Sequence, residues 1–237
     1  MSAAPGSAAG AVCAPEAAAA VRPEAQEGSA ALLTLAQWLS PAFPVGGFAF
    51  SQGLEHAFAT GVVRDAGSLR HWLSDVLEHG SGWSDAVLLC LALRQALPDA
   101  ELAELARALA PGRERLEETE VQGSAFADAV AALGLTVPAV PYPLAVGIAA
   151  RGLGLPPAQV AGLWLQAMLG NLVQVAVRLV PLGQSDGQRV LAALQPAILH
   201  TARRAATATP DDIGSAAFMA DLAALAHETM EVRLCRT

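Results

Sequence analysis

Four side chains in this sequence have types and spacing that could bind a metal ion. They fall at i, i+4, i+7 and i+8 of one predicted helix: His71, Asp75, Glu78 and His79. This spacing places them on one helix face about 100° wide, and imidazole and carboxylate groups are ligands for divalent metals. One hypothesis is therefore a helical metal-dependent hydrolase that uses His71, Asp75 and His79. The same four residues also suit the solvent-facing side of an amphipathic helix, and the sequence favours that interpretation.

A second candidate for chemistry lies near the C-terminus, where His227 is followed by Glu228 and Glu231. The pattern begins like the zinc motif H-E-x-x-H, but it has Glu231 where the second histidine must stand. It therefore fails as a zinc site. Two interpretations remain, a salt-bridged terminal helix with His227 in a hydrogen bond, and contact with a partner protein.

The basic residues exclude two further classes of enzyme. All fourteen are arginine, so the chain has neither a P-loop lysine nor a Schiff-base lysine. The net charge of -8 also argues against binding to nucleic acid, which needs clustered positive charge. Charged residues make up only 15% of the chain and hydrophobic residues 54%, so we expect a large core and a surface partly covered by partners.

The cysteines and the N-terminal segment indicate location and domain organisation. Cys13, Cys90 and Cys235 are too widely spaced for a disulfide framework or a zinc ribbon, which indicates a reducing, cytoplasmic setting. Residues 1–28 are rich in Ala, Pro and Gly and lack the features of a secretory signal. We therefore predict a disordered tail over residues 1–28 and one folded domain over residues 29–237.

Helical patterns follow one another along the folded part. Leu69, Trp72, Leu73, Val76 and Leu77 recur at helical spacing after Ser68, a predicted N-cap. The predicted helices cover residues 68–79, 84–97, 100–110, 113–133, 142–153, 156–180, 186–206 and about 209–232. We therefore predict an all-α fold, a single-domain antiparallel bundle of about eight to ten helices.

Two details of this pattern need separate comment. Residues 61–63 and 135–137 look like strands but are too short to build a sheet. Residues 160–180 are apolar enough to span a membrane, but Asn171, Gln174 and Arg178 form a polar stripe on that helix. The stripe favours a core helix over a membrane span.

Residues 40–55 combine turn-forming and aromatic residues without an evident nucleophile, base or metal site. Prolines and glycines fix an unusual backbone path, and Phe43, Phe48 and Phe50 add apolar bulk. Ser51 or Gln52 is expected to cap the helix that follows. The segment is either a buried turn between helices or a surface shaped for a partner.

This segment resembles the signature S-P-x-x-P-V-G-x-[YF]-x-x-S-x-G-L-E of the urease accessory protein UreF family. Three further stretches match that family: the Glu117–Glu118 region ending at Gly123, residues 180–188, and residues 227–237. The resemblance spans about residues 30–237. Ordered matches of this kind are more specific than any single motif.

The resemblance implies a non-catalytic, all-helical scaffold without a cofactor. It would link the nickel-carrying GTPase UreG to apo-urease through UreD, also called UreH, as a cytoplasmic homodimer that binds neither nucleic acid nor membranes. The sequence does not choose between stimulation and restraint of the GTPase. The partner-binding residues implied by the resemblance are Phe48, Glu55, Glu118, Arg178, Gln184, His227, Glu228, Arg233, Leu234 and Arg236. Cys235 stands where the family carries an aromatic residue.

Several of these assignments have a structural alternative. The acidic run around Glu118 could be a solvated helix face, Arg178 could form a buried ion pair, and Gln184 could bond within its own loop. For Phe48 and Glu55 we expect that substitution by alanine abolishes partner-dependent urease activation and leaves thermal unfolding nearly unchanged.

Overall fold

The computed structural model describes Met1 and residues 23–236. Most of the predicted disordered tail, residues 2–22, lies outside the described residues. The first helix begins at Pro23, within the range that the sequence assigned to the tail. The described residues form helices and no strand, which confirms the predicted all-α class.

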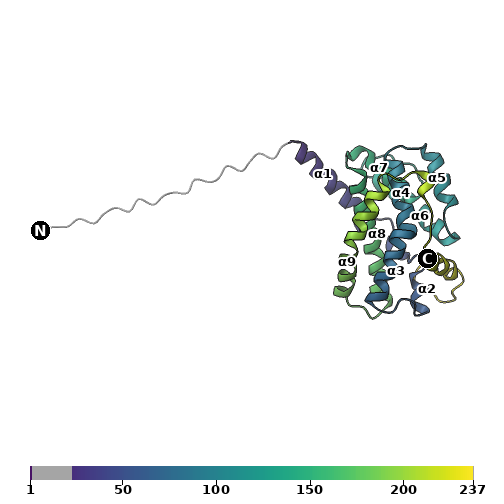
Figure 1. Cartoon of the computed structure of the whole chain (residues 1–237). Helices are drawn as coiled ribbons and strands as arrows, with labels where there is room; N and C mark the ends of the chain where they lie inside the picture. Colours follow the sequence, from purple (N-terminus) through teal and green to yellow (C-terminus); the bar gives the residue numbers. More distant parts are fainter. Residues whose placement is uncertain (2–22, 237) are drawn as a thin grey trace.

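The helices follow one another along the chain, most of them through short connections, with longer ones between α1 and α2 and between α9 and α10 (Figure 1). They are α1 (Pro23–Trp38), α2 (Leu54–Ala59), α3 (Ala66–His79), α4 (Ser81–Leu93), α5 (Asp99–Ala108), α6 (Arg113–Ala131), α7 (Tyr142–Ala150), α8 (Pro157–Leu179), α9 (Gln184–Ala205) and α10 (Phe218–His227), with the 3-10 turns η1 (Gly47–Ala49), η2 (Arg151–Leu153) and η3 (Pro210–Asp212).

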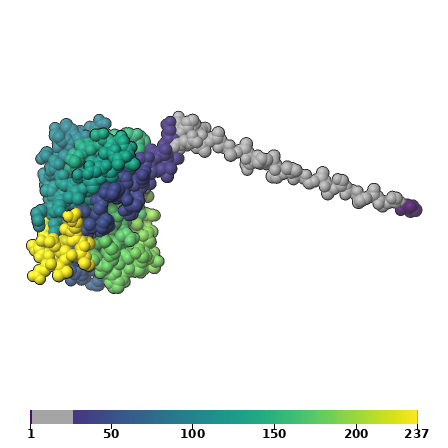
Figure 2. All heavy atoms as spheres, turned by 180° about the vertical axis from the view of Figure 1, so that it is seen from behind, coloured from purple at the N-terminus to yellow at the C-terminus, as the bar shows by residue number. Residues whose placement is uncertain are grey.

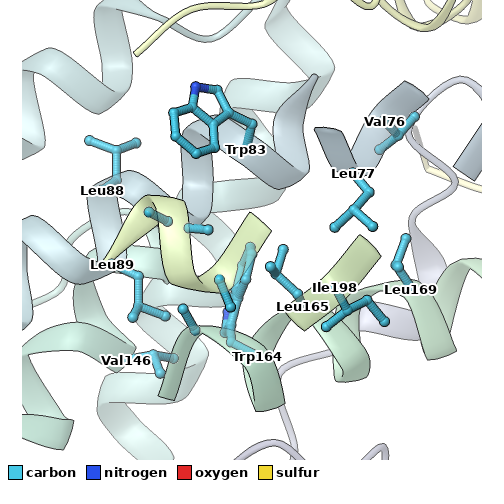
Figure 3. Packing of buried hydrophobic residues seen from close by; sticks show 14 of the residues in the cluster. Val76, Leu77, Trp83, Leu88, Leu89, Val146, Trp164, Leu165, Leu169 and Ile198 are labelled. Atoms are coloured by element: carbon cyan, nitrogen blue, oxygen red, sulfur yellow. The ribbon is translucent and has the colours of Figure 1, made fainter. Parts of the chain in front are cut away.

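The core lies where α3, α4, α7, α8 and α9 pack together. Every side chain of α4 from residue 86 to residue 92 is buried. Figure 3 shows Leu165 and Leu169 of α8 beside Leu77 of α3 and Ile198 of α9. Burying one leucine side chain stabilises a fold by ~1.5–3 kcal/mol, so this cluster holds the surface elements in fixed positions.

α8 is the one described helix that is long and apolar enough to cross a membrane. Within its apolar window, 56% is buried inside the bundle. Gln174 and Arg178, two members of the predicted polar stripe, are exposed. The packing of α8 is that of a core helix, as the sequence predicted.

The predicted last helix, residues 209–232, is wrong at both ends. Thr209 and Asp212 form the expected capping box, but it begins only the 3-10 turn η3. The next residues form tertiary hydrogen bonds in place of helical ones. Trp83 Nε1 donates to the carbonyl of Asp212, and the N–H of Ala216 donates to the carbonyl of His79. α10 therefore starts at Phe218 and ends at His227.

Smaller differences concern caps and short segments. Asp65, not Ser68, caps α3, and Ser68 takes the third helical position, where its side chain completes a capping box. The strand-like segments at residues 61–63 and 135–137 form no strand.

The turn over residues 40–55 is closed by backbone conformations that favour glycine. Gly46 has φ 72° and Gly53 has φ 78°, both in the left-handed region. Gly53 also meets α10 closely, since a Cβ atom there would lie 2.5 Å from the backbone nitrogen of Ala224. Gly53 is the N-cap of α2, and the Ser51 hydroxyl accepts the N–H of Glu55 at 3.4 Å. The turn is thus fixed against the C-terminal helix.

Candidate functional site

The turn over residues 40–55 is contacted by the C-terminal segment of the chain. The N–H of Arg236 donates to the carbonyl of Ala49 at 2.7 Å, and Arg178 of α8 donates to the carbonyl of Phe48 at 2.6 Å. In Figure 2 the C-terminal segment, in yellow, lies on the surface of the bundle. Three segments that are remote in sequence therefore meet at η1.

Glu55, in the first turn of α2, anchors the C-terminal segment through its buried carboxylate. One oxygen accepts the N–H of Leu234 at 2.7 Å, and the other accepts the N–H of Cys235 at 2.8 Å and lies 3.1 Å from His227 Nε2. Burial by itself raises the pKa of Glu55, but the two N–H groups and His227 outweigh it, so the pKa is lowered. Glu55 is therefore ionised at neutral pH.

His227, at the end of α10, is completely buried between two carboxylates. Its Nε2 faces Glu55 and its Nδ1 lies 2.8 Å from Oε2 of Glu114 on α6. Each ring nitrogen of His227 thus lies within hydrogen-bonding distance of one carboxylate oxygen. The other oxygen of Glu114 pairs with Arg233 at 2.6 Å, and Glu228 accepts the N–H of Glu114 at 3.1 Å.

A second buried polar cluster contacts the turn over residues 40–55. Arg115 pairs with Asp85 of α4 and with Glu118, whose Oε2 lies 3.2 Å from Arg115 Nη1. Glu118 also accepts a hydrogen bond from the side chain of Gln52 at 3.1 Å. Burial raises the pKa of Asp85 to about 6, with Arg115 opposing the rise and Glu118 adding to it. This cluster ties the turn to α4 and α6.

The other predicted site residues are accessible to a partner. Phe48 is 68% exposed and Leu234 is 80% exposed, and Arg178 and Arg236 are exposed beside them. Gln184 is exposed at the start of α9. No hydrogen bond or ion pair between described residues joins Gln184 to the group around Phe48.

The ten predicted partner-binding residues thus have two structural settings. Glu55, Glu118 and His227 are buried and Glu228 is half-buried. These four residues therefore support the exposed surface around Phe48 from the interior of the protein. The expectation that Glu55→Ala leaves thermal unfolding nearly unchanged is inconsistent with this burial. It is consistent with the exposed side chain of Phe48.

Three residues of these clusters, Glu114, Arg115 and Asp85, were not singled out from the sequence. A signal for Glu114 is present, because Glu114, Glu118 and Phe126 are separated by multiples of four along α6 and so share its buried face. Reading the acidic run as one charged segment hid this difference between its members.

α10 carries an exposed apolar stripe next to these clusters. Its members recur at helical spacing. They are Phe218 (70% exposed), Met219 (59%), Leu222 (58%) and Leu225 (44%). The opposite side of the helix packs against α2, α3 and α6. An exposed apolar face of this kind is a candidate site for contact with another protein.

The metal hypothesis lacks a ligand set in the part of the chain that the structure describes. No three His, Cys, Asp or Glu side chains among these residues lie together so that they could hold a metal ion, and this includes His71, Asp75 and His79 on α3. Burial, helped by Glu55, raises the pKa of Cys235 to about 11. A thiol that stays protonated is a poor metal ligand at neutral pH.

These observations define an all-helical protein in which most of the predicted functional residues lie at or beneath one exposed surface around Phe48. Comparison with known proteins identifies the family. The family model UreF matches residues 63–195. The chain therefore belongs to the UreF family of urease accessory proteins, as the resemblance predicted.

Individual relatives cover nearly the whole folded part. The chain is 59% identical over 210 residues to the urease accessory protein UreF of Cereibacter sphaeroides strain KD131, over 88% of this chain and 100% of the relative. It is 55% identical over 209 residues to that of Paracoccus denitrificans strain Pd 1222, over 88% and 97% of the two chains. For Rhodopseudomonas palustris strain TIE-1 the identity is 48% over 242 residues, with 94% and 98% covered.

Proposed function

We propose that this protein is a non-catalytic urease maturation factor in the cytoplasm. It holds the GTPase UreG and the accessory protein UreD, also called UreH, on apo-urease, and it couples GTP hydrolysis to nickel delivery. Family membership supports this role. The observation that carries it furthest is the exposed side chain of Phe48 on a turn with a fixed backbone, contacted by Arg178 and by the C-terminal segment that carries the exposed Leu234.

The surface around Phe48 suits the GTPase. Aromatic and arginine side chains are enriched among the residues that dominate binding energy at interfaces, and this surface presents Phe48 beside Arg178 and Arg236. Its backbone is already ordered, which lowers the entropy cost of binding. Because a partner shifts an equilibrium only by differential affinity, this surface acts by binding one nucleotide state of UreG more tightly than the other.

The apolar stripe of α10 suits UreD. It lies next to the C-terminal segment, whose family likeness implies docking on that accessory partner. The four exposed side chains from Phe218 to Leu225 would be covered in such a complex. The helix-in-groove mode of recognition uses apolar anchors at this spacing.

A groove between α1, α8 and α9 supports the proposed homodimer. It has a volume of about 510 Å³ and its lining includes Leu32, Leu163, Ile198 and Leu199. α1 extends from the bundle (Figure 1), and Leu33 on it is 73% exposed. Each copy thus offers both an apolar helix and an apolar groove, as an isologous interface requires.

Phe48→Ala tests the proposed function. We expect at least ~10-fold weaker capture of UreG, because truncating a central aromatic anchor costs 2 kcal/mol or more at a typical hot spot. Thermal unfolding should be unchanged, since the side chain is already exposed. Capture is measured by pull-down with UreG and UreD, with and without GTP, alongside urease activation in cells.

Leu133→Ala is the matched control, because Leu133 is an apolar side chain that is 56% exposed just after α6. It should leave capture and activation at the wild-type level. Full urease activation in cells that carry Phe48→Ala would contradict the proposal.

A further inference from the structure

Two buried carboxylates from different helices share one histidine. Glu55 of α2 is 7% exposed and Glu114 of α6 is 5% exposed, and both face the ring of His227. Buried polar groups are stable when their hydrogen-bonding partners are present. The ring of His227 lies within hydrogen-bonding distance of both carboxylates, and Arg233 pairs with Glu114, so the three side chains are joined as one unit.

Two members of this unit also hold the C-terminal segment. Glu55 accepts the N–H groups of Leu234 and Cys235, and Glu114 pairs with Arg233. The side chain of Arg233 is 40% exposed and Leu234 is 80% exposed. Among residues 233–236 only Cys235 packs against the hydrophobic core, where it is half-buried. The polar contacts with Glu55 and Glu114 therefore contribute a large part of what fixes the segment.

We infer that Glu55, His227 and Glu114 form a latch that holds residues 233–236 against the turn over residues 40–55. Within the latch, Glu114 is a positioning residue. It is buried and acts through its contacts with His227 and Arg233.

The latch determines whether the contact surface is complete. When it is closed, the N–H of Leu234 reaches Glu55 and the N–H of Arg236 reaches the carbonyl of Ala49, which keeps Leu234 and Arg236 at the turn that carries Phe48. When it is open, these two side chains leave, while Arg178 still reaches the Phe48 carbonyl from α8. Binding of a partner at this surface is thereby coupled to latch closure. This coupling rests on the proposed function, whereas the latch itself does not.

Hydrogen exchange of the C-terminal amides tests the latch directly. The variants are Glu114→Gln and His227→Gln, each of which keeps much of the side-chain bulk and changes the hydrogen-bonding groups of one member of the unit. We expect the amides of residues 234–236 to exchange at least ~10-fold faster, because removing one partner from a buried polar cluster leaves the others unsatisfied. Amides of α8 should keep their protection, which shows that the bundle is still folded.

Glu117→Gln is the matched control, because Glu117 lies on the same helix but is exposed. The exchange is measured in the full chain alone and again after addition of UreD. In addition, the Glu114→Gln and His227→Gln effects should be less than additive in the double variant, since either change opens the latch. Unchanged protection of residues 234–236 in both variants, with and without UreD, would overturn the latch.

Partner binding separates the two proposals. If the C-terminal amides exchange faster in the variants, we expect at least ~10-fold weaker capture of UreG. The reason is that UreG would then have to order residues 233–236 when it binds, which costs binding free energy. Faster exchange with wild-type capture would refute the coupling of the latch to the surface. Failure of the wild-type chain to capture UreG or UreD would refute the proposed function and leave the exchange result as the measure of the latch.

Discussion

Asp85 illustrates how a single buried side chain sets a property of the whole molecule. It shares Arg115 with Glu118, so two carboxylates compete for one guanidinium in a place with little water. Burial raises the pKa of Asp85 to about 6. The folded state therefore holds the proton of Asp85 more tightly than the unfolded state does.

This difference gives a signed prediction for stability. The pKa of Asp85 is 3.8 in its ordinary state and about 6 in the folded protein. As the pH rises through this window, ionisation of Asp85 should lower the free energy of unfolding by on the order of 3 kcal/mol. In Asp85→Asn this loss is absent, so its stability relative to wild type should improve across the window. Denaturant unfolding between pH 4 and pH 7, roughly the titration range of a shifted carboxyl, measures both proteins.

Asp75→Asn, exposed on α3, is the control for that experiment. Parallel pH curves for wild type and Asp85→Asn would contradict the assignment. Glu55 acts in the opposite sense: its pKa is lowered from 4.5, so the stability that it contributes is lost as the pH falls below that value.

At the same scale, the structure differs from the setting that the sequence predicted for two residues. The family likeness gave Glu55 and His227 as contacts for a partner, but the structure buries both, and it agrees with the alternative that placed His227 in a hydrogen bond. Their pairing joins residues 55, 114 and 227. No periodic pattern encodes a contact over such separations, so one sequence without its fold cannot reveal it.

At the scale of elements, α10 shows how tertiary contacts override a local signal. Thr209 and Asp212 form a good helix start, and the prediction of a helix from there followed the usual rules. Trp83 and His79 bind the backbone of the next residues, so the helix begins later. The ends of longer helices such as α8 were predicted nearly correctly. Their apolar residues recur at helical spacing because one face of the helix packs against the core, so the sequence pattern follows the packing.

Leu222→Glu tests the role of α10. The residue is 58% exposed, so the variant should fold with an unchanged melting temperature. Burying the new carboxylate at an apolar interface is costly, so capture of UreD should fall at least ~10-fold in a pull-down. Val121→Glu on α6, at a site that is 40% exposed, is the control. Normal capture by Leu222→Glu would place the UreD contact elsewhere.

At the scale of the whole molecule, the proposed homodimer makes a prediction about mass in solution. Leu199 is 55% exposed at the edge of the groove between α1, α8 and α9. Leu199→Arg should turn a dimer into a monomer, because an unpaired guanidinium cannot be buried in an apolar interface. Size-exclusion chromatography with light scattering measures the mass, and Leu133→Arg is the control. A monomeric wild-type chain at micromolar concentration would contradict the dimer.

The contact between the end of the chain and the turn over residues 40–55 has a consequence for synthesis. Residues 227–236 are synthesised after the turn and most of the bundle, and domains begin to fold while they are made. The carboxylates of Glu55 and Glu114 therefore lack His227 and Arg233 as partners until those residues have left the ribosome. A product that stops before residue 227 has the turn but lacks the residues that pair with these two carboxylates, so this part of the surface is completed late in synthesis.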